Sequence, residues 1–138
     1  MNYHSGMFRS ARGLIAAAAV ALAGSAPVAS AEPVPTVCSY QLSPPQVVQL
    51  SGVNVVTATL SPGACNQSTV YLTVACVKLQ GSDGPGQCAQ QNGVLTAQVF
   101  YQPYRAGATY VATGRGCANT GNPPQPVCQP VGPLTTTL

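Results

Sequence analysis

Histidine and charge are both scarce in this chain. Its 138 residues include one histidine, His4, and only 5% of them are charged. Histidine is the most versatile general base and the commonest metal ligand in proteins. Because His4 precedes an export signal, we expect the secreted chain to contain no histidine at all. A Ser-His-Asp triad is then excluded, and a zinc site loses its usual ligand.

Carboxylates are equally few. Beyond the export signal the only acidic side chains are Glu32 and Asp83. A glycosidase needs two carboxyl groups that flank one bond, whereas these two lie in the N-terminal segment and in a glycine-rich loop. We therefore predict that the protein is not an enzyme, with no catalytic, cofactor-binding or metal-binding residues and no cofactor.

Basic residues do not cluster. After the signal, Lys78, Arg105 and Arg115 are the only cations, which leaves a net charge of +1 against the two acidic residues. Nucleic-acid-binding domains need clustered Lys and Arg. The sequence thus indicates no nucleic-acid partner.

The N-terminus has the three parts of a secretory signal. Arg9 and Arg12 precede an apolar run of 11 residues at 14–24, and Ala29-Ser30-Ala31 matches a cleavage site. A membrane span needs about 20 apolar residues, so we expect no stable span after cleavage. Met1 and Met7 both remain possible starts. We predict a signal peptide with a helix at 1–31, a flexible lead at 32–36 and one domain at 37–138, located outside the cell or in the cell envelope.

What the chain does have is an even number of cysteines. There are six, and none belongs to a C-x-x-C pair. In a small exported chain this pattern predicts disulfides and not a metal or redox site. The cysteines are Cys38, Cys65, Cys76, Cys88, Cys117 and Cys128.

Short β-type runs separated by turn residues fill the rest of the chain, without a helical period. The expected strands are 37–42, 46–50, 53–60, 69–80, 94–101, 109–116 and 131–138. Ser61-Pro62-Gly63 should end the third, and 117–128 is expected to be a loop. In 94–101, alternation places Leu95, Ala97, Val99 and Tyr101 inward. The pattern predicts an all-β antiparallel sandwich of six to seven strands, or a small barrel.

Tyr104, Gly107 and Tyr110 resemble the tyrosine corner of immunoglobulin-like and fibronectin type III domains. The resemblance implies that the Tyr110 hydroxyl bonds back to the chain just upstream. Tyr104 stands where leucine is usual, and Ala112 replaces the immunoglobulin cysteine. The composition also resembles that of small exported actinobacterial proteins. The resemblance implies a single immunoglobulin-like sandwich and says nothing of function.

The sandwich interpretation restricts the 15 ways of pairing six cysteines. With strands running alternately, Cys38, Cys65, Cys117 and Cys128 fall at one end. We favour three local disulfides: 76–88 and 117–128, each of which would close a loop, and 38–65, which would tie down the edge strand. The crossed alternative, 38–117 with 65–128, stays open.

Candidate interaction residues lie on the predicted surface. Phe100 has outward parity in its strand, and aromatics with arginine are typical of interfaces. The proline-rich 117–128 loop should lie beside residues 64–68, as binding loops cluster in immunoglobulin-like domains. The candidates are Phe100, Arg105, Arg115, Asn119 and Asn122.

Three functions remain open at this point. The leading one is a secreted binding or interaction module for an unknown protein. The alternatives are a carrier of a small apolar ligand and a structural envelope protein without a discrete ligand. Asn66-Gln67-Ser68 also matches the N-glycosylation sequon, which we interpret as a chance match in a bacterial host.

Overall fold

The computed structural model describes residues 24, 27–28 and 37–138. By its internal contacts the chain divides into Met1–Glu32 and Pro33–Leu138, and every described strand belongs to the second unit. The expected signal peptide (1–31) and lead (32–36) lie outside the described residues, apart from positions 24, 27 and 28. Within the described positions, no helix has the length and hydropathy needed to cross a bilayer.

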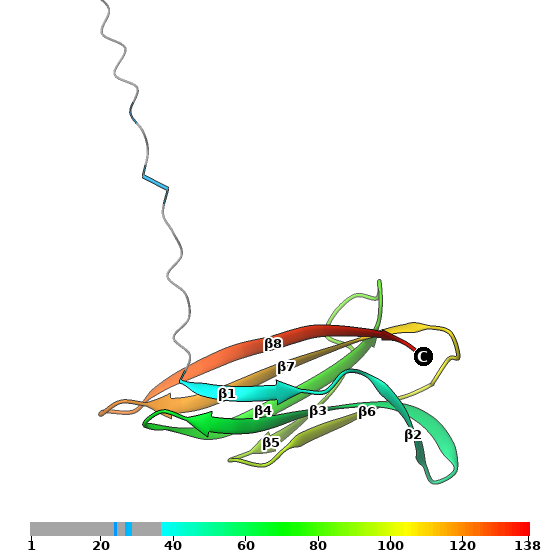
Figure 1. The fold of residues 1–138 in the computed structure, drawn as a ribbon, viewed down its shortest axis with the longest axis horizontal. Helices are drawn as coiled ribbons and strands as arrows, with labels where there is room; N and C mark the ends of the chain where they lie inside the picture. The colour runs from blue at the N-terminus through cyan, green and yellow to red at the C-terminus, as the bar shows by residue number, and fades with distance from the viewer. Residues whose placement is uncertain (1–23, 25–26, 29–36) are drawn as a thin grey trace, which may run out of the picture. The chain divides into compact units, whose positions relative to one another are not determined.

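Residues 37–138 form two antiparallel sheets (Figure 1). In the first sheet, β3 is central, with β1 and β2 along one side and β6 along the other. The second sheet has the order β5-β4-β7-β8. The strands are β1 (Cys38–Leu42), β2 (Gln46–Leu50), β3 (Val53–Cys65), β4 (Ser68–Leu79), β5 (Gln87–Asn92), β6 (Ala97–Tyr101), β7 (Thr109–Thr120) and β8 (Gln125–Thr137).

The edge strand of the first sheet is split in two. β1 pairs with the second half of β3 and β2 pairs with its first half. Pro44-Pro45 separates the two pieces, because a proline has no N–H to give to a ladder. Both pieces pair with β3, so the strand does not switch sheets at the prolines, although such a break suits a strand that does.

The core lies between the two sheets and consists largely of small side chains. Val56, Ala58 and Leu60 of β3 are fully buried. Ala75 and Val77 of β4 and Ala112 of β7 pack against them from the second sheet, and Ala97 and Val99 of β6 lie beside them in the first. Glycine is required where the sheets approach most closely: a Cβ on Gly114 would lie 2.9 Å from Leu60 Cδ1, and one on Gly116 would overlap the Tyr40 ring.

The expected count of six to seven strands is wrong, because the described residues contain eight. The missed strand is β5, whose sequence QCAQQN has no apolar alternation. It is an exposed edge strand held by the ladder with β4. The prediction that Leu95 points inward is also wrong, since β6 begins only at Ala97 and Leu95 is 59% exposed.

β3 does not end at Leu60 but continues through Ser61-Pro62-Gly63 to Cys65. β1 pairs with this extension, whereas β6 begins at Ala97, opposite Leu60, and does not reach the extension. Beyond Leu60, β3 therefore has a partner on one side only, and a proline is tolerated at such an edge.

The prediction of a loop at 117–128 is wrong as well. β7 continues to Thr120 and β8 begins at Gln125, so the segment is a hairpin with a turn at 121–124. β8 is the edge of its sheet, which is where its prolines are tolerated. The expected last strand, 131–138, is only the second half of β8.

The three disulfides have the local pairing: Cys38–Cys65, Cys76–Cys88 and Cys117–Cys128. Each joins two residues that lie directly opposite one another in adjacent strands of one sheet. The favoured local pairing is thus confirmed, and each disulfide cross-links two neighbouring strands as well as closing the chain between them. None of the three connects the two sheets.

Candidate functional site

Three chain segments meet at the end of the sandwich that carries Cys38, Cys65, Cys117 and Cys128. They are the start of β1, the β3–β4 turn and the β7–β8 hairpin, which lie together on the left of Figure 1. The ladder between β4 and β7 places Ser68 opposite Thr120. We call these three segments the disulfide end.

Two adjoining hollows mark the surface of the disulfide end, and both are open to solvent. The first has a volume of about 440 Å³ and is lined by Val37, Asn66, Gln67, Thr120, Gly121 and Asn122. The second, of about 300 Å³, is lined by Val37, Cys38, Ser39, Ala64, Cys65 and Asn66. The two hollows adjoin at Val37 and Asn66, and the Cys38–Cys65 disulfide lines the second of them. We call the two adjoining hollows the depression.

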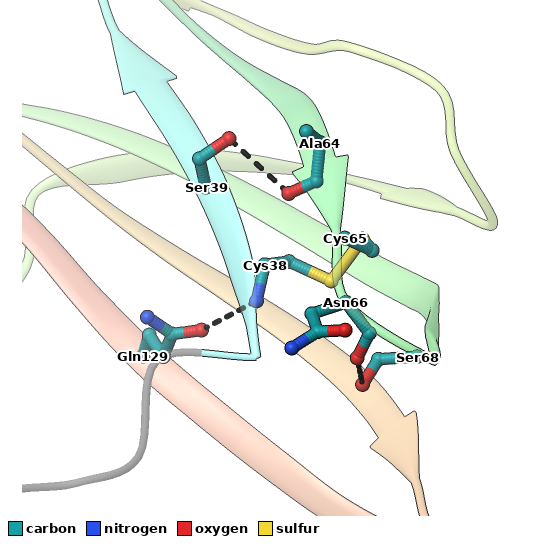
Figure 2. The surroundings of a disulfide bond; sticks show 7 residues. All are labelled: Cys38, Ser39, Ala64, Cys65, Asn66, Ser68 and Gln129. Carbon is teal, nitrogen blue, oxygen red and sulfur yellow. Dashed lines mark hydrogen bonds between the residues drawn. A yellow bond between two sulfur atoms is a disulfide. The ribbon is translucent and has the colours of Figure 1, made fainter.

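Hydrogen bonds fix the strand ends around this depression (Figure 2). Cys38 N–H donates to Gln129 Oε1 at 3.4 Å, and Ser39 Oγ donates to Ala64 O at 3.3 Å. The first bond joins β1 to β8 in the other sheet, and the second joins β1 to β3. The start of β1 is thus attached to both sheets at the disulfide end.

The β3–β4 turn is held in the same way. Asn66 N–H donates to Val37 O at 2.9 Å, and Ser68 Oγ donates to Asn66 O at 2.9 Å. Gln67 has a φ of 48°, a left-handed conformation that a non-glycine residue adopts only where its surroundings require it. A turn ordered in this way has little conformational freedom to lose on binding a partner.

The larger hollow is polar, and none of the residues that line either hollow is charged. The larger hollow is lined by the amide side chains of Asn66, Gln67 and Asn122, and an amide both donates and accepts hydrogen bonds. Arg115 lies elsewhere, opposite Val74 and Pro130 along β7. The arrangement matches neutral hydrogen-bonding groups of a partner, such as backbone amides.

Only part of the predicted interaction set comes together here. Asn122 lines the depression, and Asn119 is exposed on β7 two residues before the hairpin turn. Phe100 lies on β6 with 37% of its surface exposed. Arg105 precedes β7 at the opposite end of that strand, and Arg115 lies in its middle. The five candidates therefore do not form one surface.

The residues of the tyrosine-corner resemblance have structural contacts. The hydroxyl of Tyr110 accepts a hydrogen bond from Arg105 N–H at 2.8 Å, which is the contact that the resemblance implies. Tyr104 packs against the core, and Gly107 has a φ of 76°. These residues hold the segment that enters β7.

Comparison of the chain with protein-family models, with curated proteins and with solved structures finds no match. Within the residues that the structure describes, no three His, Cys, Asp or Glu side chains come together as metal ligands would. The site must therefore be interpreted from its own geometry.

Tyr40 of β1 lies just behind the depression, and its ring covers the backbone of Gly116. Its hydroxyl oxygen is buried and has no hydrogen-bond partner among the described residues. Burial, and secondly the nearby Tyr71, raise the pKa of the Tyr40 hydroxyl above its ordinary value of 10.0. A buried polar group without a partner reduces the stability of the fold.

We expect Tyr40→Phe to leave stability unchanged or to raise it by up to about 1 kcal/mol, because the substitution removes an unsatisfied hydroxyl and keeps the ring. The benefit should grow with pH. Because the pKa of Tyr40 is raised in the folded protein, the hydroxyl ionises at a lower pH in the unfolded chain than in the folded one. The free energy of unfolding therefore falls as the pH rises above the ordinary tyrosine pKa, and Tyr40→Phe removes this loss. Urea unfolding of both proteins at pH 7 and pH 11 measures this, and a Tyr40→Phe protein that is less stable at both values contradicts it.

Proposed function

We propose that the chain is an exported, non-catalytic binding module with an immunoglobulin-like sandwich. In this proposal it recognises a protein partner in the extracellular space or cell envelope through the depression at the disulfide end. Three disulfides suit an oxidising compartment of this kind.

The strand arrangement supports the immunoglobulin-like assignment. β4, β7 and β8 lie side by side in one sheet, and β1, β3 and β6 share the other. Strands C, F, G and A, B, E of immunoglobulin domains divide in the same way. The Tyr110 hydrogen bond adds to this. The disulfides differ, because antibody domains have one that bridges the two sheets.

The observation that carries the function is the amide-lined depression beside two disulfides. Cys38–Cys65 lies at its border, and Cys117–Cys128 cross-links the hairpin that supplies Gly121 and Asn122. Asparagine and glycine are common in recognition loops because they adapt their hydrogen bonds to the partner. A rigid frame beneath such groups lowers the entropic cost of binding.

An apolar-ligand carrier would need a pocket between the sheets. The hollows found in the described part of the chain are open to solvent at the surface. Small core residues such as Ala58, Ala75 and Ala112 bring the sheets together and are fully buried. The geometry therefore favours the interaction module over the carrier.

A photo-crosslinking amino acid at Asn122 tests the proposal. We expect it to form one dominant adduct with an envelope or secreted protein when the full-length protein is exported by its host. The matched control carries the same amino acid at Gln80, which is exposed just after β4 at the opposite end of that strand. Adducts that are absent, or identical from both positions, contradict a specific site at the disulfide end.

A further inference from the structure

Natural sheets protect their edge strands against pairing with another chain, by proline, charge, short length or a cover. Two edges of this sandwich are protected by proline. Pro126, Pro130 and Pro133 interrupt β8, and Pro44-Pro45 breaks the β1–β2 edge.

The β6 edge is short, and its end is occupied. β6 has five residues, and the side chain of Gln87 binds the backbone immediately after it. Gln87 Nε2 donates to Gln102 O at 2.8 Å, and Gln102 N–H donates to Gln87 Oε1 at 3.3 Å. This side-chain pair replaces the backbone partner that a further strand would supply at Gln102.

Among the described hydrogen bonds, β5 is tied to the segment after β6 only through Gln87, its first residue. One side of β5 pairs with Leu72 to Val77 of β4. Its other side is an edge of the second sheet. Its sequence, QCAQQN, contains no proline and no charge, and most of its residues are exposed. Along the open edge of β5, alternate residues point their backbone N–H and C=O groups away from β4.

We propose that two copies of this chain pair through their β5 strands, antiparallel and about a two-fold axis, to form one continuous sheet from the two four-stranded ones. Residues opposite one another must lie on the same face of the joined sheet. An axis at Gln90 satisfies this requirement: Gln90 then faces Gln90 of the second copy, and Ala89 faces Gln91.

The chemistry of β5 favours a second copy as the occupant. Like charges opposite one another would oppose self-pairing, and the strand has none. Its glutamine and asparagine amides each donate and accept, so the strand is complementary to itself. A partner of strong charge would find no complementary group along β5.

The turn after β5 supplies apolar contacts for the same arrangement. Val94 and Leu95 are 67% and 59% exposed. In the register centred on Gln90 they would face Gly86 and Pro85 of the second copy, where a glycine leaves room for a side chain. The turn is fixed to β4, because Gly93 N–H donates to Tyr71 O and Thr73 Oγ1 donates to Leu95 O, both at 2.8 Å.

Because Gln90 meets itself on the axis, charge substitutions there give a decisive test by analytical ultracentrifugation. The unsubstituted protein should dimerise. Gln90→Lys and Gln90→Glu, each alone, should weaken the dimer at least about fivefold through like-charge repulsion. An equimolar mixture of the two should restore a mixed dimer. The matched controls are Gln41→Lys and Gln41→Glu, at an exposed position of β1. Neither control should change the dissociation constant of the dimer.

Several results would overturn the proposal. They are a monomer at every concentration, failure of the mixture to recover, or equal weakening by the Gln41 controls. Hydrogen exchange of the unsubstituted protein gives a check that does not depend on the folding of a variant. β5 amides should become more protected as protein concentration rises, and protection that does not change with concentration contradicts the inference.

Discussion

Tyr110→Ala is expected to lower the free energy of unfolding by about 3–5 kcal/mol, as removal of a buried aromatic ring does. Tyr110 is fully buried between the sheets. Its ring meets that of Tyr101 edge-on, with the ring centres 5.5 Å apart. The substitution thus removes a packed ring, an aromatic pair and a hydrogen-bond acceptor at once.

Tyr110→Phe separates these contributions. It keeps the ring but leaves Arg105 N–H without its acceptor, so we expect a loss of about 1 kcal/mol. Tyr71→Phe is a suitable control, because the Tyr71 hydroxyl has only an exposed contact with Cys128 Sγ at 3.7 Å. Guanidinium unfolding of the three variants measures the series. Equal stability of Tyr110→Phe and the unsubstituted protein would show that the tyrosine-corner bond contributes nothing.

Removal of single disulfides should destabilise the fold in the order of the chain lengths they enclose. Cys38 and Cys65 are 27 residues apart, whereas the other two pairs are separated by 12 and 11 residues. Loop-closure entropy then gives about 3.5 kcal/mol for the first disulfide and about 2.8 kcal/mol for each of the others.

Three double alanine variants, unfolded in denaturant without reductant, test this order. Mass spectrometry of each variant confirms that the two remaining disulfides are intact. The Cys38–Cys65 variant should be the least stable and should also lose crosslinking from Asn122, because that disulfide borders the depression. If it is the most stable of the three, the entropic ranking is wrong.

Strands with an apolar period or a proline break were predictable from the sequence. β1 and β2 were located by Pro44-Pro45, and β4 by its long apolar run. β5 was not, because its identity as a strand comes from pairing with β4 and not from its own polar residues. The β7–β8 hairpin was missed for a related reason: edge strands tolerate prolines that otherwise indicate a loop.

The candidate site was only partly predictable. The expected neighbourhood of residues 64–68 and the 117–128 segment is present, because alternating strand direction brings both to one end. The contribution of Val37, and the bond from Cys38 to Gln129, depend on how the start of β1 approaches the second sheet. No local pattern encodes that approach. Phe100 and Arg105 were grouped by sequence proximity, which the fold does not preserve.

The placement of the disulfides also determines how the protein would respond to a pulling force. All three join neighbours within a sheet, so force applied at the two ends of the domain can separate the sheets without breaking a covalent bond. Each disulfide would still keep its enclosed segment from extending. These segments span 27, 12 and 11 residues, so about half of residues 37–138 would add no length. A stretched molecule would therefore gain only about half of the length that the same chain would reach without disulfides.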